Sequence, residues 1–214
     1  MQEKYFKRIE TGAIIADRKE GVFCFIYSEN SKPHISNSEL DSDTRNQSYP
    51  EIAMIMNWRA GFGFPGGTVD EDEVEEHGIK GARKVAVLRE VKEEINFEMN
   101  NDKLSDILCT HDLGDFVVHM YAYKVTEKEL LEIRDGIKNA SHSRSEAIGF
   151  NLIPCVNIGK NGDLGLPMFL SHNIGFAVRE ELVIGIDTLK LIPKEELSLI
   201  CKKAGYSYKR LLGK

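Results

Sequence analysis

The first third of the chain alternates short apolar runs with polar turns, a pattern typical of β-strands. Residues 12–16 (GAIIA) and 22–27 (VFCFIY) flank the turn-like segment DRKEG, which predicts a hairpin or two paired strands. Residues 28–50 are polar and rich in serine, so we expect a loop insertion at the surface or a lid. Residues 51–58 (EIAMIMNW) are mostly apolar and predict a buried strand that leads directly into a GFPGG turn.

Between residues 80 and 95 the apolar positions follow the spacing of a helix. Val87, Val91 and Ile95 recur at intervals of four and share one arc of a helical wheel, which should face the core. Asn96 comes where this helix should end, because asparagine tolerates the left-handed turn that often closes helices. The acidic run before it, at about residues 70–79 (DEDEVEEHGI), predicts an inserted loop.

The second half of the chain predicts two more strands and three helices. The strands are expected at residues 116–125 and 146–155, and the helices at 126–136, 174–186 and 193–212. Thr126 and Glu129 have the spacing of a capping box, which marks a helix start. Strands and helices do not alternate regularly and no internal repeat is visible. We therefore predict an α/β fold in which helices flank a mixed sheet.

Composition predicts a single soluble domain over residues 1–214. Hydrophobic residues make up 42% of the chain, enough for a sizeable core, and no apolar run reaches the length of a membrane span. The N-terminus lacks the apolar core of a signal peptide, and the cysteines lie far apart. These features favour a reduced intracellular protein, nuclear or cytoplasmic.

Net charge bears on the partners of the protein. A value of −6 argues against a broad basic surface for long nucleic acids. The basic residues that cluster do so near the end of the chain: Lys202, Lys203, Lys209, Arg210 and Lys214. They suit the solvent face of a terminal helix, and a contact with RNA or a targeting role is the alternative.

The densest candidate chemistry lies on the helix predicted over residues 80–95. Glu90, Glu93 and Glu94 occupy positions i, i+3 and i+4, so their carboxylates leave the helix on one side. A divalent cation would offset the repulsion among them, since Mg²⁺ and Mn²⁺ prefer oxygen ligands. Arg89 can pair with Glu93 one turn later and orient it. A solvated helix face would give the same short pattern, so this stretch alone does not decide.

A glycine turn upstream favours the metal interpretation. Gly66 and Gly67 follow Phe64 and Pro65, and glycine permits a backbone carbonyl to approach a ligand or metal closely. A strand, a Gly-Gly turn, a connecting segment and then REVKEE (residues 89–94) together resemble the Nudix box. The REVKEE residues match the REUxEE core of that box in order.

The sequence departs from the Nudix box in two places. Asn96 stands where the family has glycine, an acceptable substitute at a helix end. The segment from Gly67 to Arg89 is longer than usual, and counting back from Arg89 to the family's early glutamate reaches Gly81. We interpret the acidic run as the insertion that accounts for the extra length.

The resemblance extends well beyond the box. NWRAGFGFPGGTVD, HMYAYKVTEKELLEI, EAIGFNLIPC, GLPMFL and GFAVREEL are similar, in the same order, to the snoRNA-decapping Nudix hydrolases, also known as inosine diphosphate phosphatases (Nudix hydrolase sixteen). The similarity covers about residues 22–182. It implies a Nudix α/β/α sandwich around a mixed β-sheet, with Mg²⁺ or Mn²⁺ as cofactor. It also implies a homodimer that cleaves a phosphoanhydride bond in purine nucleotides or capped RNA, with no membrane partner.

The resemblance assigns roles at the metal site. The implied metal ligands are the carbonyl of Gly66 and the side chains of Glu90, Glu94 and His111. In the corresponding mechanism Glu93, beside Arg89, helps take the proton of the attacking water. Without the resemblance His111 would be an ordinary loop histidine, and His119 is expected to pack within its strand.

The substrate contacts transfer less completely. The family's base-facing aromatic corresponds to Phe64, and its base-stacking histidine to Phe23, which is also a flat ring able to stack. Its phosphate-contacting arginine falls on Asn57, with Arg59 two residues away as a substitute. Its purine-reading glutamine falls on Glu181, which accepts but does not donate hydrogen bonds when ionised. The sequence therefore supports hydrolysis better than it supports a preference for hypoxanthine.

Three functions remain open from the sequence. The chain could hydrolyse small nucleoside di- or triphosphates, or ADP-ribose and dinucleotides, which suits its acidic charge. It could remove caps from RNA, which suits the resemblance and the basic C-terminal residues. A catalytically silent binding module is the third possibility, and the intact REVKEE run argues against it.

Overall fold

The computed structural model describes residues 6–32, 47–57, 61–142, 146–158, 161–172 and 174–213. Most of the polar insertion expected at residues 28–50 lies outside these residues, and so does Arg59.

Within the described residues, eight strands form one mixed sheet whose central strand is β2 (Lys19–Ser31). β2 pairs in parallel with β7 (Phe116–Lys124) and antiparallel with β3 (Tyr49–Asn57). The remaining strands are β1 (Lys7–Ile9), β4 (Phe62–Gly63), β5 (Gly66–Thr68), β6 (Cys109–Asp112) and β8 (Ala147–Pro154). The order is β1-β6-β7-β2-β3-β4, with β5 on β2 and β8 on β3. The predicted mixed sheet is confirmed.

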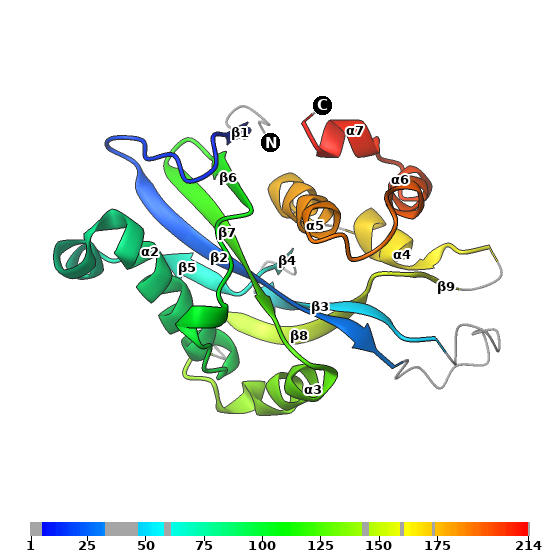
Figure 1. Ribbon diagram of the computed structural model, residues 1–214, viewed down its shortest axis with the longest axis horizontal. Helices are drawn as coiled ribbons and strands as arrows, with labels where there is room; N and C mark the ends of the chain where they lie inside the picture. The colour runs from blue at the N-terminus through cyan, green and yellow to red at the C-terminus, as the bar shows by residue number, and fades with distance from the viewer. Residues whose placement is uncertain are drawn as a thin grey trace.

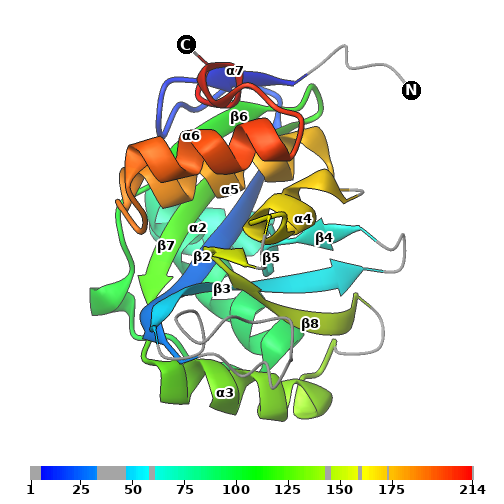
Figure 2. The same cartoon turned by 90° about the vertical axis from the view of Figure 1, so that its right-hand side faces the viewer.

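Helices cover both faces of the sheet (Figure 1). One face carries α2 (Glu71–Ile95) and α3 (Glu127–Gly136), and the other carries α4 (Leu166–Ser171), α5 (Phe176–Thr188), α6 (Lys194–Lys203) and α7 (Tyr208–Leu211). Short 3-10 turns, η1 (Asn101–Lys103) and η2 (Ile137–Asn139), and a small hairpin of β9 (Asn157–Ile158) and β10 (Leu164–Gly165) complete the described elements. Figure 2 shows α6 and α7 across one end of the molecule and α3 at the opposite end.

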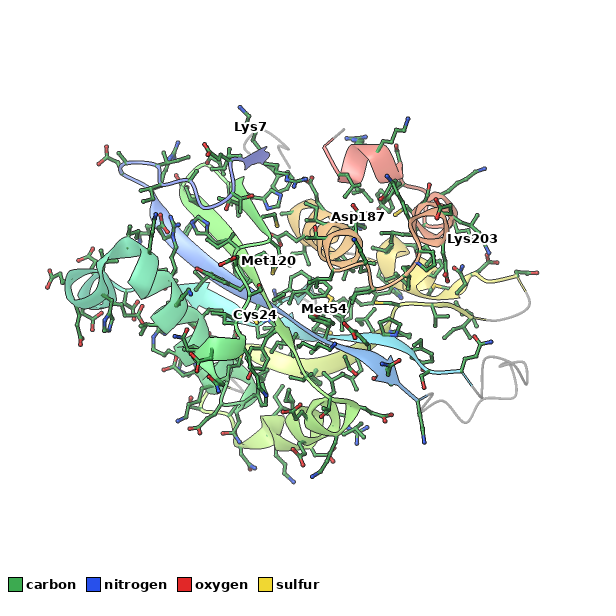
Figure 3. The ribbon with its side chains drawn as sticks, viewed as in Figure 1. Lys7, Cys24, Met54, Met120, Asp187 and Lys203 are labelled. Atoms are coloured by element: carbon green, nitrogen blue, oxygen red, sulfur yellow. The ribbon has the colours of Figure 1, made fainter. Side chains whose placement is uncertain are left out.

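The two faces have separate hydrophobic cores because side chains alternate along each strand. In β2, Phe25 points to the core under α4–α7, whereas Cys24 and Ile26 point to the core under α2 and α3. Met54 and Met120 belong to the first core and lie at the centre of the molecule in Figure 3. This alternation sets which residues share a face with the candidate site.

The predicted hairpin at residues 12–16 and 22–27 is wrong. Residues 22–27 belong to β2, but residues 12–16 form no strand. Their backbone instead serves the buried side chain of Arg83, which donates hydrogen bonds to the carbonyls of Gly12 and Ala13 at 3.0 and 3.1 Å. Ile14 is 54% exposed. A side chain 70 residues away therefore fixes this segment, and the apolar pattern did not reveal it.

The expected acidic loop at residues 70–79 is also wrong, because these residues begin α2. Asp70 is the N-cap, and its N–H donates to Glu73 Oε2 at 2.9 Å, as in a capping box. Gly78 is non-helical (φ 64°, ψ 160°), so α2 consists of two helical segments that meet at a kink. The expected end at Asn96 is confirmed, since Asn96 adopts the left-handed conformation (φ 55°, ψ 38°).

The later elements agree with the pattern apart from one helix. The capping box at Thr126 and Glu129 is present, with Glu129 N–H donating to Thr126 Oγ1 at 3.2 Å. The helix expected over 193–212 is divided into α6 and α7, because Gly205 takes a positive φ of 84° between them. Among the described residues no helix is long and apolar enough to cross a membrane.

Candidate active site

Two adjacent glycines in β5 allow two carboxylates of α2 to lie against the sheet. The N–H of Gly66 donates to Glu94 Oε2 at 2.7 Å, and Gly66 has a φ of 148° that side chains rarely adopt. A Cβ on Gly66 would lie 2.1 Å from the carbonyl oxygen of Val22. A Cβ on Gly67 would lie 2.4 Å from the carboxyl carbon of Glu90. Gly67 is therefore required for the close packing of Glu90, and Gly66 for the close approach of β5 to β2 from which its N–H reaches Glu94.

Arg89 holds the acidic side chains of this region in place. Its Nε donates to Glu73 Oε1 at 2.9 Å, and its Nη1 donates to Glu90 Oε1 at 2.9 Å and Glu93 Oε2 at 3.3 Å. The predicted pairing of Arg89 with Glu93 is confirmed. Its Nη2 also donates to the carbonyl of Thr68 at 3.0 Å. One guanidinium thus connects the start of α2, its last turns and β5.

Sequence reasoning missed Glu73. Counting back from Arg89 pointed to Gly81, whereas the structure brings Glu73 to Arg89 across the kink at Gly78. The available signal was the pair of Asp70 and Glu73, whose spacing marks a helix start. Interpreting the acidic run as a loop hides this helix start.

Burial makes Glu90 and Glu94 weaker acids than an exposed glutamate. Burial is the largest effect on Glu94 and, with the nearby charges of Glu90, Glu146 and Glu93, raises its pKa to about 8 despite the hydrogen bond from Gly66. Burial also raises the pKa of Glu90, although the hydrogen bond from Arg89 acts in the opposite direction. Both shifts favour the protonated form of these carboxylates in the protein without a bound cation.

A cavity of about 460 Å³ opens beside Glu94. Five of the residues proposed from the sequence line it: Phe23, Asn57, Phe64, Gly66 and Glu94. The sequence did not single out the others, which are Ile55, Phe62, Gly63, Glu146 and Val178. The lining therefore combines aromatic and aliphatic side chains with two carboxylates. The volume falls in the range usual for small-molecule sites.

The aromatic residues of this cavity are unequally accessible. Phe64 is only 2% exposed and packs against Phe25, with ring centroids 5.5 Å apart. Phe23 and Phe62 are partly exposed. Phe62 meets Phe169 edge to face at 5.0 Å. Phe23 and Phe62 therefore offer more ring surface to a ligand than Phe64 does.

His111 and Glu181 lie together, apart from the residues that line the cavity. The sequence predicts a loop around His111, but this residue lies in β6. It is fully buried under α5. Its Nε2 is 3.3 Å from Glu180 Oε1, and its Nδ1 is 3.2 Å from Glu181 Oε1. Burial acts to lower the pKa of His111, but its hydrogen bonds with Cys109, Glu180 and Glu181 raise it overall. The structure brings neither residue into contact with Glu90 or Glu94.

His119 packs inside its strand, as expected. Its Nε2 is 3.1 Å from Glu20 Oε2, and its Nδ1 is 3.0 Å from Thr110 Oγ1. Glu20 in turn accepts a hydrogen bond from Arg83 Nη2 at 2.7 Å. This buried network joins β2, β6, β7 and α2, and so supports the frame on which the site is built.

Comparison with known proteins identifies the family. Residues 21–192 match the model of the Nudt16-like family, described as U8 snoRNA-decapping enzyme-like. The U8 snoRNA-decapping enzyme of Mus musculus is 30% identical over 66% of this chain and 70% of its own length. The enzyme of the same name from Homalodisca vitripennis is 30% identical over 69% of this chain and 72% of its own length.

The chain belongs to the Nudt16-like family of Nudix hydrolases. Solved structures agree on the fold. A MutT/nudix family protein from Enterococcus faecalis superposes with a TM-score of 0.51 at 13% identity, over 95% of this chain and 83% of that one. One from Listeria innocua gives the same TM-score and identity over 80% and 94%. The predicted Nudix sandwich is confirmed. The prediction that the protein is a pyrophosphohydrolase is also confirmed.

Nudix hydrolases generally use divalent metals, and Mg²⁺ and Mn²⁺ prefer oxygen donors. In the described part of the chain no three His, Cys, Asp or Glu side chains form a ready-made ligand group. Glu90 and Glu94 nevertheless supply two buried, hard oxygen donors. Mg²⁺ is commonly held by one or two carboxylates together with substrate phosphates and water, so this pair fits an ion that arrives with a nucleotide.

Proposed function

We propose that this Nudix hydrolase cleaves a phosphoanhydride bond of a purine nucleotide, either free as a di- or triphosphate or as the cap of an RNA. The cavity whose lining combines aromatic rings with the carboxylates of Glu94 and Glu146 carries this proposal. A base stacks on aromatic rings, and its phosphates extend toward the carboxylate end. The names of the curated relatives, U8 snoRNA-decapping enzymes, support the RNA cap as one form of the substrate.

Glu90, Glu94 and the carbonyl of Gly66 are the proposed ligands for Mg²⁺ or Mn²⁺. When bound, such a cation offsets the negative charge of the phosphates and makes a water molecule more acidic. Arg89 keeps Glu90 in place through its 2.9 Å hydrogen bond, and the Gly66 N–H keeps Glu94 in place. The raised pKa of Glu94, which burial causes above all and the neighbouring carboxylates increase, supports this assignment, because a bound cation would stabilise its ionised form.

Base recognition in this proposal rests on stacking. Phe23 and Phe62 present rings to the cavity, and Asn57 supplies an amide at its edge. Glu181 is buried and its carboxylate is engaged by His111, so it does not serve as a purine reader. We therefore expect weak discrimination among inosine, guanosine and adenosine nucleotides.

A hydrolysis panel tests the proposal directly. Inosine, guanosine and adenosine di- and triphosphates, ADP-ribose, dinucleotides and capped RNA are incubated with Mg²⁺, Mn²⁺ or EDTA. Glu94→Gln should lower kcat at least 10²-fold, since the metal contribution is several kcal/mol. Glu76→Gln, at an exposed position of the same helix, is the matched control. Turnover by Glu94→Gln close to that of the unmodified protein would contradict the assignment.

Salt dependence separates the two forms of the substrate. Binding to the body of a capped RNA would neutralise several phosphates, so its affinity should fall steeply with salt. A free nucleotide held inside the cavity should show a weaker dependence. Equal slopes for capped RNA and the corresponding free cap nucleotide would show that only the nucleotide end is recognised.

A further inference from the structure

A groove runs along α6 and α7 and shares no lining residue with the substrate cavity. It consists of two hollows of about 460 and 740 Å³, whose linings have Ser198, Tyr208 and Lys209 among their common residues. All of the lining residues lie beyond residue 192, where the match to the Nudt16-like family model ends. The proposed hydrolysis uses none of them, so the α6–α7 groove needs a separate explanation.

The charge of this segment differs from that of the rest of the chain. Residues 190–214 contain seven lysines and arginines and two acidic residues, whereas acidic residues outnumber basic ones by eleven in residues 1–189. Three of the cations, Lys194, Lys202 and Lys209, line the groove and are exposed. A basic segment on an otherwise acidic protein is typical of a contact with a polyanion.

Lys202 and Lys209 are available to a ligand. The neighbouring Lys203 is not, because it donates hydrogen bonds to the carbonyls of Asn161 and Gly162 and so holds another turn in place. In the described part of the chain, by contrast, no acidic side chain forms an ion pair with Lys202 or Lys209. Glu195 is the only acid among the described residues that line the groove. The groove therefore presents an excess of positive charge to solvent.

Aromatic rings lie between these cations. Tyr206 lines the first hollow, and Tyr208 lines both. Tyr208 is only 8% exposed, and its hydroxyl donates to Asp187 Oδ1, which ties α7 to α5. Tyr206 is half-buried between α6 and α7, so its ring is the one that can meet a ligand. Proteins that bind single-stranded nucleic acids combine such elements, because cations pair with the phosphates while bases stack on aromatic rings.

Arg179 on α5 connects the groove with the substrate cavity. Its guanidinium lies over the ring of Tyr206, 4.3 Å from the centroid. Its Nε and Nη2 donate to the carbonyls of Leu170 and His172, each at 3.0 Å, so its position is fixed. The preceding residue of the same helix, Val178, lines the substrate cavity. Consecutive residues of α5 thus face the two sites, and an RNA whose capped end occupies the cavity would have the groove close by.

We propose that the α6–α7 groove binds the single-stranded RNA that follows the cap, an inference that rests on the proposed function. Lys194, Lys202 and Lys209 pair with phosphates of the RNA backbone, and an unpaired base stacks on Tyr206. The groove thereby distinguishes a capped RNA from a free nucleotide, which occupies the cavity alone. Because stacking requires unpaired bases, a duplex RNA of the same length binds more weakly.

Fluorescence anisotropy with a labelled, uncapped single-stranded RNA tests the groove in EDTA, where binding does not depend on hydrolysis. Lys202→Gln/Lys209→Gln should lower the affinity about tenfold. Each phosphate contact on a single strand contributes about 0.7 to the slope of log affinity against log salt, so this slope should flatten by about 1.4. Lys103→Gln/Lys128→Gln is the matched control, because it removes the same charge from exposed positions of η1 and α3. α3 lies at the opposite end of the molecule from α6 and α7 (Figure 2).

Two single substitutions test the individual contacts in the same assay. Tyr206→Leu should weaken RNA binding about tenfold, because the stacking surface is lost. Glu195→Gln should tighten RNA binding about twofold, because it removes a charge that repels the phosphates. A groove with a purely structural role would show no such gain in affinity.

Steady-state kinetics connects the groove with the reaction. For capped RNA, Lys202→Gln/Lys209→Gln should raise KM about tenfold and leave kcat unchanged. For the free cap nucleotide, both constants should equal those of the unmodified protein, because the cavity is intact. Thermal unfolding of each variant checks that the fold is retained.

Four results would overturn the inference. They are an unchanged RNA affinity in Lys202→Gln/Lys209→Gln, an equal loss in the control pair, no RNA binding by the unmodified protein, and binding to vesicles of phosphatidylserine and phosphatidylcholine in place of RNA. A protein that binds RNA through these lysines but hydrolyses nothing on the panel would refute the proposed function and leave the groove as an RNA site.

Discussion

Replacing Gly67 by alanine should displace the carboxylate of Glu90 while leaving Glu90 itself unmutated. The new Cβ would lie 2.4 Å from both the carboxyl carbon and Oε1 of Glu90, and 2.6 Å from its Oε2. Gly67 pairs with Val22 across the β2–β5 ladder, and its backbone does not need a positive φ. Alanine is therefore compatible with the strand, and the clash is confined to Glu90.

The size of the effect follows from that clash. An ordinary contact at a Cβ begins near 3.4 Å, so the carboxylate of Glu90 must move by about 1 Å. A misplacement of this size at a reacting centre costs about 10²-fold in rate, or about 2.7 kcal/mol in the activation barrier. Overpacking typically costs about 1–3 kcal/mol of stability. We expect the low end, because the atoms that must move are the end of a side chain and not backbone.

The assay combines kinetics with a stability cycle. kcat/KM and thermal unfolding are measured for Gly67→Ala and for Gly21→Ala, a strand glycine whose added Cβ would meet its nearest neighbour at an ordinary 3.5 Å. Only the first should lose activity. In a Glu90→Ala background the stability cost of Gly67→Ala should disappear, because the clashing group is gone. Full activity in Gly67→Ala, or an unchanged cost in the double variant, would refute the reasoning.

Three further outcomes follow from individual side chains. Asn96→Ala should lower stability by about 1 kcal/mol, measured by thermal unfolding, whereas Asn96→Gly should not, because residue 96 is left-handed. The pKa of Glu94 in the folded protein is about 8, above the ordinary 4.5, so between these pH values the metal-free folded protein holds a proton that the unfolded chain releases. The free energy of unfolding should therefore fall as pH rises from about 4.5 to 8, by up to about 5 kcal/mol. In urea titrations at several pH values, Glu94→Gln should show a weaker dependence of this free energy on pH. Arg83→Met would leave the buried Glu20 without its arginine partner and should lower the free energy of unfolding by about 3–5 kcal/mol. Lys84→Met, on the exposed side of α2, should change it little. Equal unfolding temperatures of the two variants would contradict this.

Local patterns were enough to predict most elements of the fold. Strands such as β3 and β7 carry long apolar runs, and α3 carries its own capping box, so neighbours along the chain decide their conformation. The REVKEE motif likewise predicted that Glu90, Glu93 and Glu94 share one side of a helix. What failed depended on distant groups. Residues 12–16 look like a strand, but the buried Arg83 draws their carbonyls away from any sheet.

The sequence by itself determined the class of enzyme, because the Gly-Gly turn and the REVKEE run that follows it resemble the Nudix box of pyrophosphohydrolases. Tertiary structure decided which residues share the site. It brought Phe62 and Glu146 to the cavity from separate strands and loops, and it placed His111 and Glu181 together under α5. The physical reason is that helix periodicity fixes neighbours within one turn, whereas the packing of helices against the sheet determines which distant side chains meet.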